Sequence, residues 1–329
     1  MSNLKVICIG EALIDKIINK SDSNFKNYLG GAPANVACAL RKLNVPVSFI
    51  GCLGDDDFGR EFLNLFQKLN INIEFLQISK QSHTRVVKVI RDKKGDRSFS
   101  GFEINDNNSF ADEILDKSCV SKSIKNLNKQ FLNTKFIVTG TNLLASSQSA
   151  QTLYYILDHA KNFKIKIIID VNWREIFWDD SNNKIDIYIK KIKEFLHFAD
   201  ILKLASEEAD LFFNTNDPTK ISQLLINKPD VIITNGPNPI KWYINGIKGV
   251  NQVIKHKSKI IDTTGAGDAF LAGLISRFHI DKNLNDQSTI KEYVEFASVC
   301  GLLTCFGEGA IENQPEEKLI YNYLENVGS

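Results

Sequence analysis

Short apolar runs alternate with longer amphipathic segments along most of this 329-residue chain, and that alternation limits the folds open to it. Segments with helical periodicity, such as residues 148–163 and 186–199, separate most of the apolar runs. Strands and helices in alternation predict an α/β fold with a mainly parallel central sheet flanked by helices. In such folds, ligands bind at the carboxyl ends of the strands. The predicted strands are residues 5–10, 47–54, 136–140, 166–170, 199–205 and 231–236.

Two segments depart from that alternation. Residues 84–102 contain two strand-like runs joined by a turn, and residues 12–29 show no helical stripe. Together they predict a small separate sheet, a lid formed from about residues 12–29 and 84–105 on a single domain of residues 1–329. Such a lid would close over a site and exclude water, whereas an ordinary edge hairpin is the alternative. A second hairpin is predicted around Asn245-Gly246, a pair that suits a tight turn.

The net charge of the chain indicates which kinds of partner it binds, and its cysteines indicate the redox state of its cellular compartment. A net charge of +1, with basic and acidic residues intermixed, argues against a surface that binds nucleic acid or membranes. A small-molecule partner is therefore expected. Six cysteines without a C-x-x-C pair indicate free thiols in a reducing compartment. Because the sequence shows no signal-like start and no apolar run of membrane length, a cytoplasmic location is expected.

The stretch IDTTGAGDAFLAG, residues 261–273, combines small residues with an acid at the start of a predicted helix. Gly265, Ala266 and Gly267 let a ligand approach the backbone closely, and the apolar residues after them recur at helical spacing. A helix N-terminus has unpaired N–H groups and a positive partial charge, which suit a phosphate. Asp268 would stabilise the helix dipole by at most about 1 kcal/mol, which explains the acid but not the glycines. Beside a bound phosphoryl group, the acid is better explained as a proton acceptor.

Several other motifs in the sequence resemble known nucleotide or metal sites but lack the residues that those sites require. Asp57-Phe58-Gly59 has the letters of the protein-kinase magnesium motif, but the H-R-D loop and the Gly-rich loop of that family are missing. The GAGDAF stretch begins like a dinucleotide fingerprint, yet Phe270 stands where the third glycine is needed. The sequence contains no G-x-x-x-x-G-K-[ST] loop, and its five histidines are dispersed without metal-ligand spacing.

Four further stretches lie at predicted strand ends or in glycine-rich turns. They read GEALID at 10–15, GGAPAN at 30–35, DVNWR at 170–174 and ASEE at 205–208. Together with the glycine-rich stretch near residue 265, they make the sequence resemble the PfkB, or ribokinase-like, family of carbohydrate kinases over essentially the whole chain. GGAPANVACAL is similar to the N-terminal signature of that family, and DTTGAGDAFLAGL is similar to the C-terminal one. The resemblance implies a Rossmann-like core with a β-sheet lid, ATP as phosphoryl donor and a sugar hydroxyl as acceptor.

The resemblance also implies roles for residues at matching positions. Asp268 would take the proton from the 6-hydroxyl of the sugar, and the N–H groups of residues 265–267 would form an anion hole for the phosphoryl group. Arg85 and Arg97 on the lid are weaker candidates for the site, and a solvated position is the alternative for both. The residues implied to bind the sugar are Asp15, Gly31, Asn35, Asn172 and Arg174.

Residues for the nucleotide and for two kinds of metal ion follow from the same resemblance. Glu208 matches the acid of an N-x-x-E motif that organises Mg²⁺ through water. Asp262 and Thr264 match positions at which many members bind a monovalent cation, and hard oxygen ligands suit K⁺. The residues implied to bind ATP are Thr234, Gly236, Gly265 and Gly267.

The sequence departs from the family pattern in three places, which concern the magnesium site, the nucleotide loop and the sugar contact. Ala205 stands where the N-x-x-E motif has asparagine, so another group, such as Ser206, would supply that hydrogen bond. Pro239 follows Gly236 where a second glycine is usual, which predicts a stiffer loop beside the nucleotide. Residues 102–112 contain no arginine, whereas many fructokinases have one there, and this leaves the sugar contact from the lid open.

D-Fructose is the acceptor that the resemblance favours, because GEALID, GGAPANVA and DVNWREIFW are most similar to fructokinases. Kinases for 2-keto-3-deoxygluconate, ribose or a nucleoside are the enzymatic alternatives. A catalytically silent relative kept as an assembly partner is another alternative, although Asp268 and its glycines are intact. Exposed strand edges in the lid are natural pairing surfaces, and they predict a homodimer formed through the lid.

Overall fold

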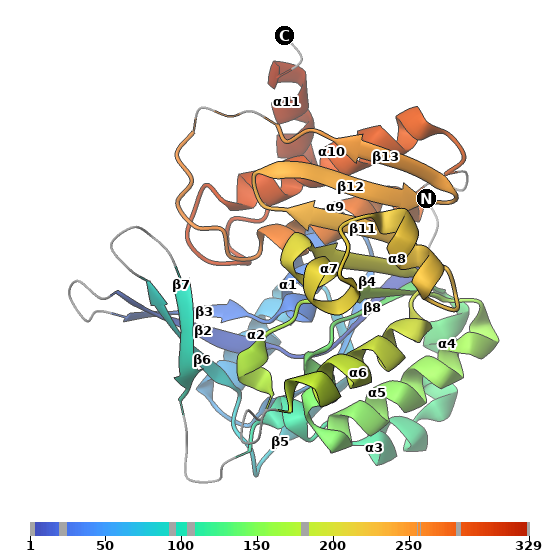
Figure 1. The fold of residues 1–329 in the computed structure, drawn as a ribbon. Helices are drawn as coiled ribbons and strands as arrows, with labels where there is room; N and C mark the ends of the chain where they lie inside the picture. Colours follow the sequence, from blue (N-terminus) through green and yellow to red (C-terminus); the bar gives the residue numbers. More distant parts are fainter. Residues whose placement is uncertain are drawn as a thin grey trace.

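The computed structural model describes residues 4–19, 25–91, 97–103, 109–178, 184–254, 256, 258–280 and 284–327. Within these residues the backbone forms a nine-stranded sheet in the order β13-β12-β11-β10-β9-β8-β1-β4-β5 and a separate four-stranded sheet (Figure 1). Neighbouring strands from β11 to β5 are parallel, whereas β12 and β13 are antiparallel. The predicted α/β fold with a mainly parallel sheet is therefore confirmed. The strands of the large sheet are β1 (Lys5–Ile9), β4 (Val47–Gly54), β5 (Asn72–Ser79), β8 (Thr134–Thr139), β9 (Lys166–Asp170), β10 (Ile201–Ala205), β11 (Asp230–Asn235), β12 (Asn238–Ile244) and β13 (Ile247–Asn251).

The six predicted strands all occur, each within two residues of its expected bounds. The hairpin of β12 and β13 also forms as predicted, and it turns at Asn245 and Gly246, whose φ angles of 49° and 81° are both positive. Strand β5 was not predicted. It lies at the edge of the sheet and carries polar side chains between its apolar ones, so no continuous apolar run marks it in the sequence.

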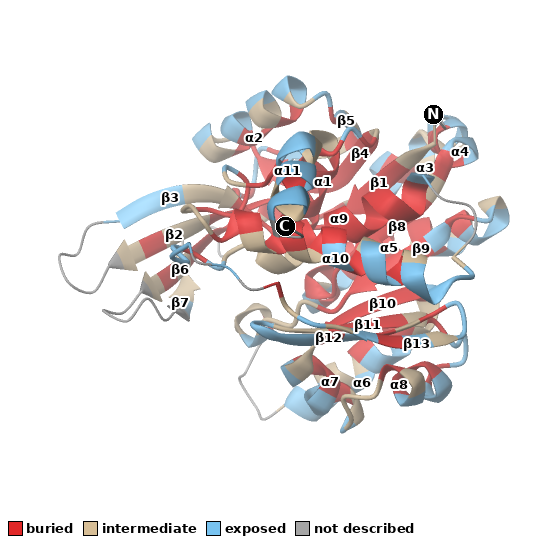
Figure 2. Cartoon of the chain, turned by 90° about the horizontal axis from the view of Figure 1, so that it is seen from above, coloured by how far each residue is buried: buried red, intermediate tan, exposed pale blue. Residues whose placement is uncertain are grey.

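Helices cover both faces of the large sheet. Val6 and Cys8 of β1 face one apolar core, and Ile7 and Ile9 face the other. The first core lies under α1, α2, α9, α10 and α11, and the second lies under α3 to α8 (Figures 1 and 2). In the part of the chain that is described, no helix is long and apolar enough to cross a membrane. The helices are α1 (Ala32–Lys42), α2 (Asp57–Lys68), α3 (Lys117–Lys122), α4 (Ile124–Leu132), α5 (Ser147–Ala160), α6 (Ile185–Phe195), α7 (Ser206–Phe213), α8 (Pro218–Leu224), α9 (Ala266–Ile280), α10 (Gln287–Thr304) and α11 (Glu317–Val327).

The small sheet stands beside the main body and has its own apolar cluster (Figure 1). Its strands, in spatial order, are β3 (Phe25–Gly30), β2 (Leu13–Asn19), β6 (Val86–Arg91) and β7 (Arg97–Phe102). The segment at 84–102 is thus part of a separate sheet and not an edge hairpin of the large one. Residues 20–24, 92–96, 104 and 105 of the predicted lid lie outside the described residues. Closure of this sheet and dimerisation through it stay predictions.

Arg85 anchors the small sheet to the main body. Its side chain is 4% exposed, and its guanidinium donates three hydrogen bonds to Asp112, at 2.8, 3.0 and 3.2 Å, and one to Glu113 at 2.7 Å. The guanidinium also lies 4.2 to 4.8 Å from the ring centres of Phe102, Phe110 and Phe177. Arg85 is therefore a buried structural residue, neither solvated nor in the wall of the candidate site. The side chain of Arg97, the other arginine considered, lies outside the described structure.

Replacing Arg85 with methionine should destabilise the fold by about 3–5 kcal/mol, because Asp112 would be left as a buried carboxylate without its partner. The free energy of unfolding in urea, measured by circular dichroism, tests this value. Arg60→Met is the matched control, since Arg60 is 57% exposed and its solvent-screened pairs with Asp55 and Asp57 should contribute little to stability. Equal effects of the two substitutions would contradict the anchoring role.

Candidate active site

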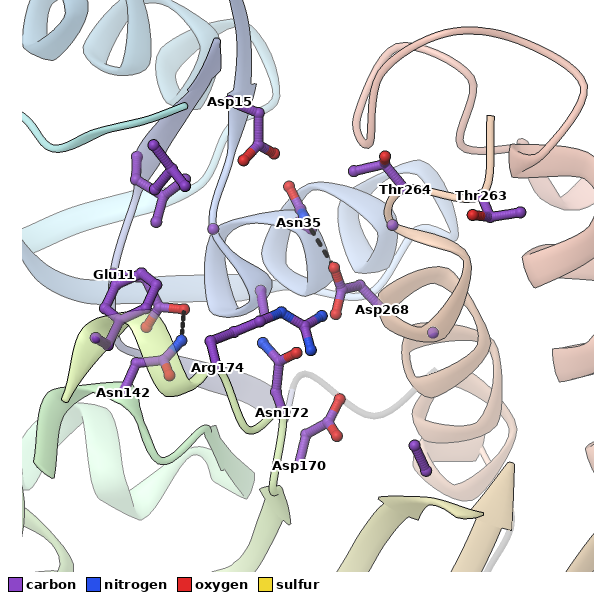
Figure 3. A pocket seen from close by; sticks show the side chains of 18 of the residues that line it. Glu11, Asp15, Asn35, Asn142, Asp170, Asn172, Arg174, Thr263, Thr264 and Asp268 are labelled. Carbon is purple, nitrogen blue, oxygen red and sulfur yellow. Dashed lines mark hydrogen bonds between the residues drawn. The ribbon is translucent and has the colours of Figure 1, made fainter. Parts of the chain in front are cut away.

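A cavity opens at the carboxyl ends of β1, β9, β10 and β11, where the strand–helix alternation predicts a ligand site. The N-termini of α1 and α9 and one face of the small sheet complete its wall (Figure 3). All five residues predicted to bind the sugar line this cavity, although they come from segments far apart in the sequence. They are Asp15, Gly31, Asn35, Asn172 and Arg174.

Asp268 lies in the first turn of α9 and points toward α1 (Figure 3). The amide of Asn35, in α1, donates a hydrogen bond of 2.8 Å to the Asp268 carboxylate. Gly265, just before α9, has a φ of 76°, and a Cβ atom there would come within 2.8 Å of Ala310. The glycine is therefore required by both the backbone conformation and the space, and it allows the helix tip to face the cavity.

The pKa of Asp268 is raised to about 6. Desolvation of the carboxyl in the cavity wall is the largest cause, and the charge of Asp170 adds to it, although the residue as a whole is only partly buried. The hydrogen bond from Asn35 and the charges of Lys203 and Arg174 act in the opposite direction. A carboxylate with a pKa near 6 is mostly ionised at neutral pH and still basic enough to accept a proton from an alcohol.

The three residues of the predicted anion hole do not all line the same cavity. Gly265 and Gly267 line the cavity with Asp268. The N–H of Ala266 donates a hydrogen bond of 3.3 Å to the carbonyl of Thr263, and Ala266 lines a neighbouring cavity. A Cβ atom at Gly267 would lie 3.2 Å from Nζ of Lys203, so a side chain there would press on that ammonium group.

The neighbouring cavity is mostly apolar and was not predicted from the sequence. It shares Thr234, Thr263 and Gly267 with the first cavity, so the two spaces meet at the tip of α9. Gly236, predicted to bind ATP, lines only this second space. The apolar side chains in its wall come from β12, from the segment between β13 and α9, and from α9 and α10, and they are Ile240, Val253, Ile254, Ile260, Phe270 and Leu302. A flat aromatic base would suit such a wall.

Glu208, predicted to act on Mg²⁺ through water, lies in the wall of the first cavity. Its two carboxylate oxygens accept hydrogen bonds of 2.7 Å from the backbone N–H groups of Trp173 and Ala205. Burial and the charge of Asp170 raise its pKa. The hydroxyl of Ser206 donates to Asn216, and Ser206 does not line the cavity. The structure therefore gives no support to Ser206 as the substitute for the missing asparagine.

Asp262, predicted to hold a monovalent cation, is buried beneath the loop before α9. Its carboxylate accepts hydrogen bonds from the backbone N–H and the hydroxyl of Thr264, at 2.8 and 2.7 Å, and from the N–H of Gly309 at 3.1 Å. These bonds fix the loop that leads into the α9 tip. Thr264 itself lines the first cavity.

Sequence reasoning missed Lys203 and Asp170, a buried ion pair in the wall of the first cavity. Nζ of Lys203 donates hydrogen bonds of 2.9 and 2.7 Å to the two oxygens of Asp170, and both side chains are less than a tenth exposed. The pair places a cation beside Gly267. A lone lysine inside the apolar strand ILKLA, residues 201–205, was the available signal, because a buried charge requires a partner.

Glu11 and Asn142 were also missed. Glu11 follows β1, Asn142 follows the adjacent strand β8, and the amide of Asn142 donates a hydrogen bond of 3.0 Å to the Glu11 carboxylate (Figure 3). Both line the first cavity and are almost fully buried. Desolvation raises the pKa of Glu11 to about 7. An acid directly after a buried strand was the signal in the sequence.

A sequence model of the pfkB family carbohydrate kinases matches residues 3–317. The chain belongs to this family. This pfkB family protein is 30% identical to probable fructokinase-5 of Arabidopsis thaliana, over 94% of each chain, and 28% identical to the fructokinase of Vibrio alginolyticus, over 96% of this chain and 97% of that one. Among solved structures, it is similar to a Vibrio cholerae O395 fructokinase in a fructose-, ADP- and calcium-bound form. The TM-score is 0.82 with 26% identity, over 98% of this chain and 100% of that one.

The ribokinase-like fold is shown by the structural comparison as well. A Xylella fastidiosa fructokinase with bound ATP superimposes with a TM-score of 0.86 at 24% identity and covers all of both chains. The predicted family and the predicted fold class are thus confirmed, and the protein is a carbohydrate kinase. The roles of individual site residues stay predictions.

Asp268→Asn should stabilise the fold at pH 7.5 by about 1–3 kcal/mol, because the raised pKa means that the ionised carboxylate is disfavoured in the folded state. The folded pKa lies above the unfolded one, so the cost of ionisation is fully present above about pH 6. It disappears as the pH falls to about 4. Unfolding free energies of both proteins at pH 4.5 and 7.5 test this, and a pH-independent difference would contradict the raised pKa.

Proposed function

We propose that this protein transfers the γ-phosphoryl group of ATP to the 6-hydroxyl of D-fructose and is a fructokinase. The observation that carries the proposal is the position of Asp268 at the tip of α9, in the cavity wall and hydrogen-bonded to Asn35. Carboxylate and amide groups that suit hydroxyls lie in one cavity, and the apolar cavity meets it at this tip. A sugar and a nucleotide in these two spaces would bring their reacting ends together at Asp268.

The named relatives support fructose as the acceptor. The Arabidopsis and Vibrio proteins at 28–30% identity are named as fructokinases, and the Vibrio cholerae structure is named as a complex with fructose and ADP. Kinases of this fold also act on other acceptors, since an aminoimidazole riboside kinase superimposes with a TM-score of 0.76 at 22% identity. Ribose, a nucleoside and 2-keto-3-deoxygluconate therefore stay in the set of substrates to be tested.

In the proposed reaction, Asp268 accepts the proton of the sugar hydroxyl while that oxygen forms a bond to the γ-phosphorus. The bond between the γ-phosphorus and the bridging oxygen breaks, and ADP leaves with that electron pair. The N–H groups of Gly265 and Gly267, at the positive end of α9, stabilise the charge on the phosphoryl group. Leu13 and Val87 of the small sheet line the cavity, so closure of this sheet would exclude water from the reaction.

The charge of the first cavity favours a divalent cation as cofactor. In its described wall, five carboxylates face two cationic side chains, so a nucleotide phosphate would be repelled without counter-ions. We propose that Glu208 and Asp170 bind water ligands of Mg²⁺, because their oxygens retain lone pairs beside those used within the protein. When bound, Mg²⁺ neutralises charge on the β- and γ-phosphates. For K⁺, the Asp262 side chain fits less well, since it already accepts three hydrogen bonds from its own loop and Gly309.

Asp268→Asn should lower kcat roughly 10²- to 10⁴-fold, because the amide cannot accept the proton from the sugar. Nucleotide binding, measured by calorimetry, should be nearly unchanged. In the wild type, kcat/KM should fall about tenfold per unit as the pH is lowered below about 6, since Asp268 must be ionised. Unchanged turnover in the variant would contradict the role of Asp268 as the base.

A coupled ADP assay with fructose, ribose, a nucleoside and 2-keto-3-deoxygluconate tests the choice of acceptor. Fructose should give the highest kcat/KM. A rate with fructose no better than that with ribose would contradict the fructokinase assignment and leave the kinase assignment intact. Absence of phosphorylation of every acceptor would favour the catalytically silent alternative.

A further inference from the structure

Residues 309–314, between α10 and α11, support the loop that leads into α9. Ala310 is 1% exposed and packs against Gly265, where an added Cβ atom would lie 2.8 Å from the Cα atom of Ala310. The N–H of Gly309 donates a hydrogen bond of 3.1 Å to the carboxylate of Asp262, and the same carboxylate binds the loop before α9. A shift of residues 309–314 would therefore move the tip of α9.

The same segment supports the first turn of α1. The side chain of Gln314 is buried, and its amide donates a hydrogen bond of 2.9 Å to the backbone carbonyl of Asn35. The side-chain amide of Asn35 in turn donates to the carboxylate of Asp268 (Figure 3). The position of Gln314 therefore influences how the amide of Asn35 is directed toward Asp268.

Lys42, the last residue of α1, holds this segment in place. Its ammonium group donates hydrogen bonds to the backbone carbonyls of Ile311, Glu312 and Gln314, at 2.7, 3.2 and 3.1 Å. An ammonium group has three donors, so all three are used on one short segment. Carbonyl oxygens that converge on one point repel one another unless a cation lies between them. The conformation of residues 309–314 therefore depends on the charge of Lys42.

The geometry of α1 places this cation on the same side as the site. Lys42 follows Asn35 by seven residues, which is close to two full turns, so both lie on one face of the helix. Residues 309–314 contact this face at both ends, at Asn35 and at Lys42. Burial lowers the pKa of Lys42, which shows that its ammonium group is partly desolvated. Hydrogen bonds from a desolvated cation are stronger than those at the surface.

We propose that Lys42 is a positioning residue, which holds residues 309–314 and through them directs the amide of Asn35 toward Asp268 at the tip of α9. Lys42 lines a separate groove beside Lys68, at the other end of α1, so it acts through other residues. Its consequence for catalysis rests on the proposed kinase function, whereas its effect on Asp268 is a property of the unliganded protein. The hydrogen bond from Asn35 lowers the pKa of Asp268, so a displaced amide should let this pKa rise.

The test measures the pKa of Asp268 in the unliganded protein by carboxyl ¹³C NMR titration, in which the spectrum of Asp268→Asn identifies the resonance. Lys42→Met should raise this pKa from about 6 to about 7, as for loss of one hydrogen bond to the carboxylate. The acidic limb of the kcat/KM profile should move in the same direction. At pH 8, kcat should fall roughly 10- to 100-fold, because the reacting groups are misplaced. Lys42→Arg keeps the charge and the donors and should restore most of both values.

Lys68→Met is the matched control. The charge of Lys68 acts on Lys42, so this substitution removes the same charge from the same groove. The three carbonyls stay bound to Lys42 in this variant, and the pKa of Asp268 and kcat should be unchanged. Melting temperatures identify a variant that fails to fold. If Lys42→Met does so, Gln314→Met serves in its place and should also raise the pKa of Asp268, because it removes the hydrogen bond to the carbonyl of Asn35.

The possible results distinguish this inference from the proposed function. If Lys42→Met lowers the melting temperature but leaves the pKa of Asp268 unchanged, the inference is overturned and Lys42 has a purely structural role. An equal rise of that pKa in Lys68→Met would also overturn it, since loss of a nearby charge would then be the cause. If the wild type phosphorylates no acceptor, the kinase proposal fails, and the NMR titration still decides whether Lys42 directs Asn35 toward Asp268.

Discussion

The hydrogen bond between Asn35 and Asp268 is the contact on which the candidate site depends. It joins the first turns of α1 and α9, which are 233 residues apart in the sequence. Gly31 and Gly265 precede these helices, and their positive φ angles of 97° and 76° allow both helix tips to face one cavity. A Cβ atom at Gly31 would lie 2.6 Å from the carbonyl of Glu11, so the glycine is also what lets α1 approach the end of β1.

The environment that suits Asp268 to its proposed role as a base also costs folding free energy when the carboxyl is ionised. Asp268 is desolvated and lies near Asp170, which raises its pKa, and the amide of Asn35 limits the rise. Lys203 compensates Asp170 and stands beside Gly267, where the transferred phosphoryl group would pass in the proposed reaction. Asp268, Asn35 and the Lys203–Asp170 ion pair therefore act as one electrostatic unit, and the pKa of Asp268 depends on all of them.

The sequence predicted the fold and the glycine-rich helix tip because both have local signatures. Apolar runs marked six strands of the large sheet, and Asn245-Gly246 marked the turn of the β12–β13 hairpin. Strand β5 was not predicted because it lies at the sheet edge and mixes polar and apolar residues. Arg85 looked like a surface or substrate residue, since its partners Asp112 and Glu113 are close only after folding.

Which of the missed residues come together in the site depends on three-dimensional contacts that the sequence does not display. Glu11 and Asn142 meet because β1 and β8 are neighbours, although 131 positions separate them in the chain. The apolar second cavity is assembled from four separate segments, so no short motif contains it. A short sequence motif identifies groups that lie in one turn. The order of strands in the sheet determines which strand ends line the same cavity.

A structure with both a sugar and a non-hydrolysable ATP analogue bound would show whether the reacting groups meet at the tip of α9. We expect the hydroxyl to be phosphorylated to lie within about 3.2 Å of an Asp268 carboxylate oxygen, with the terminal phosphate against the N-terminus of α9. A terminal phosphate bound away from that helix tip, or a sugar whose hydroxyls do not reach Asp268, would contradict it.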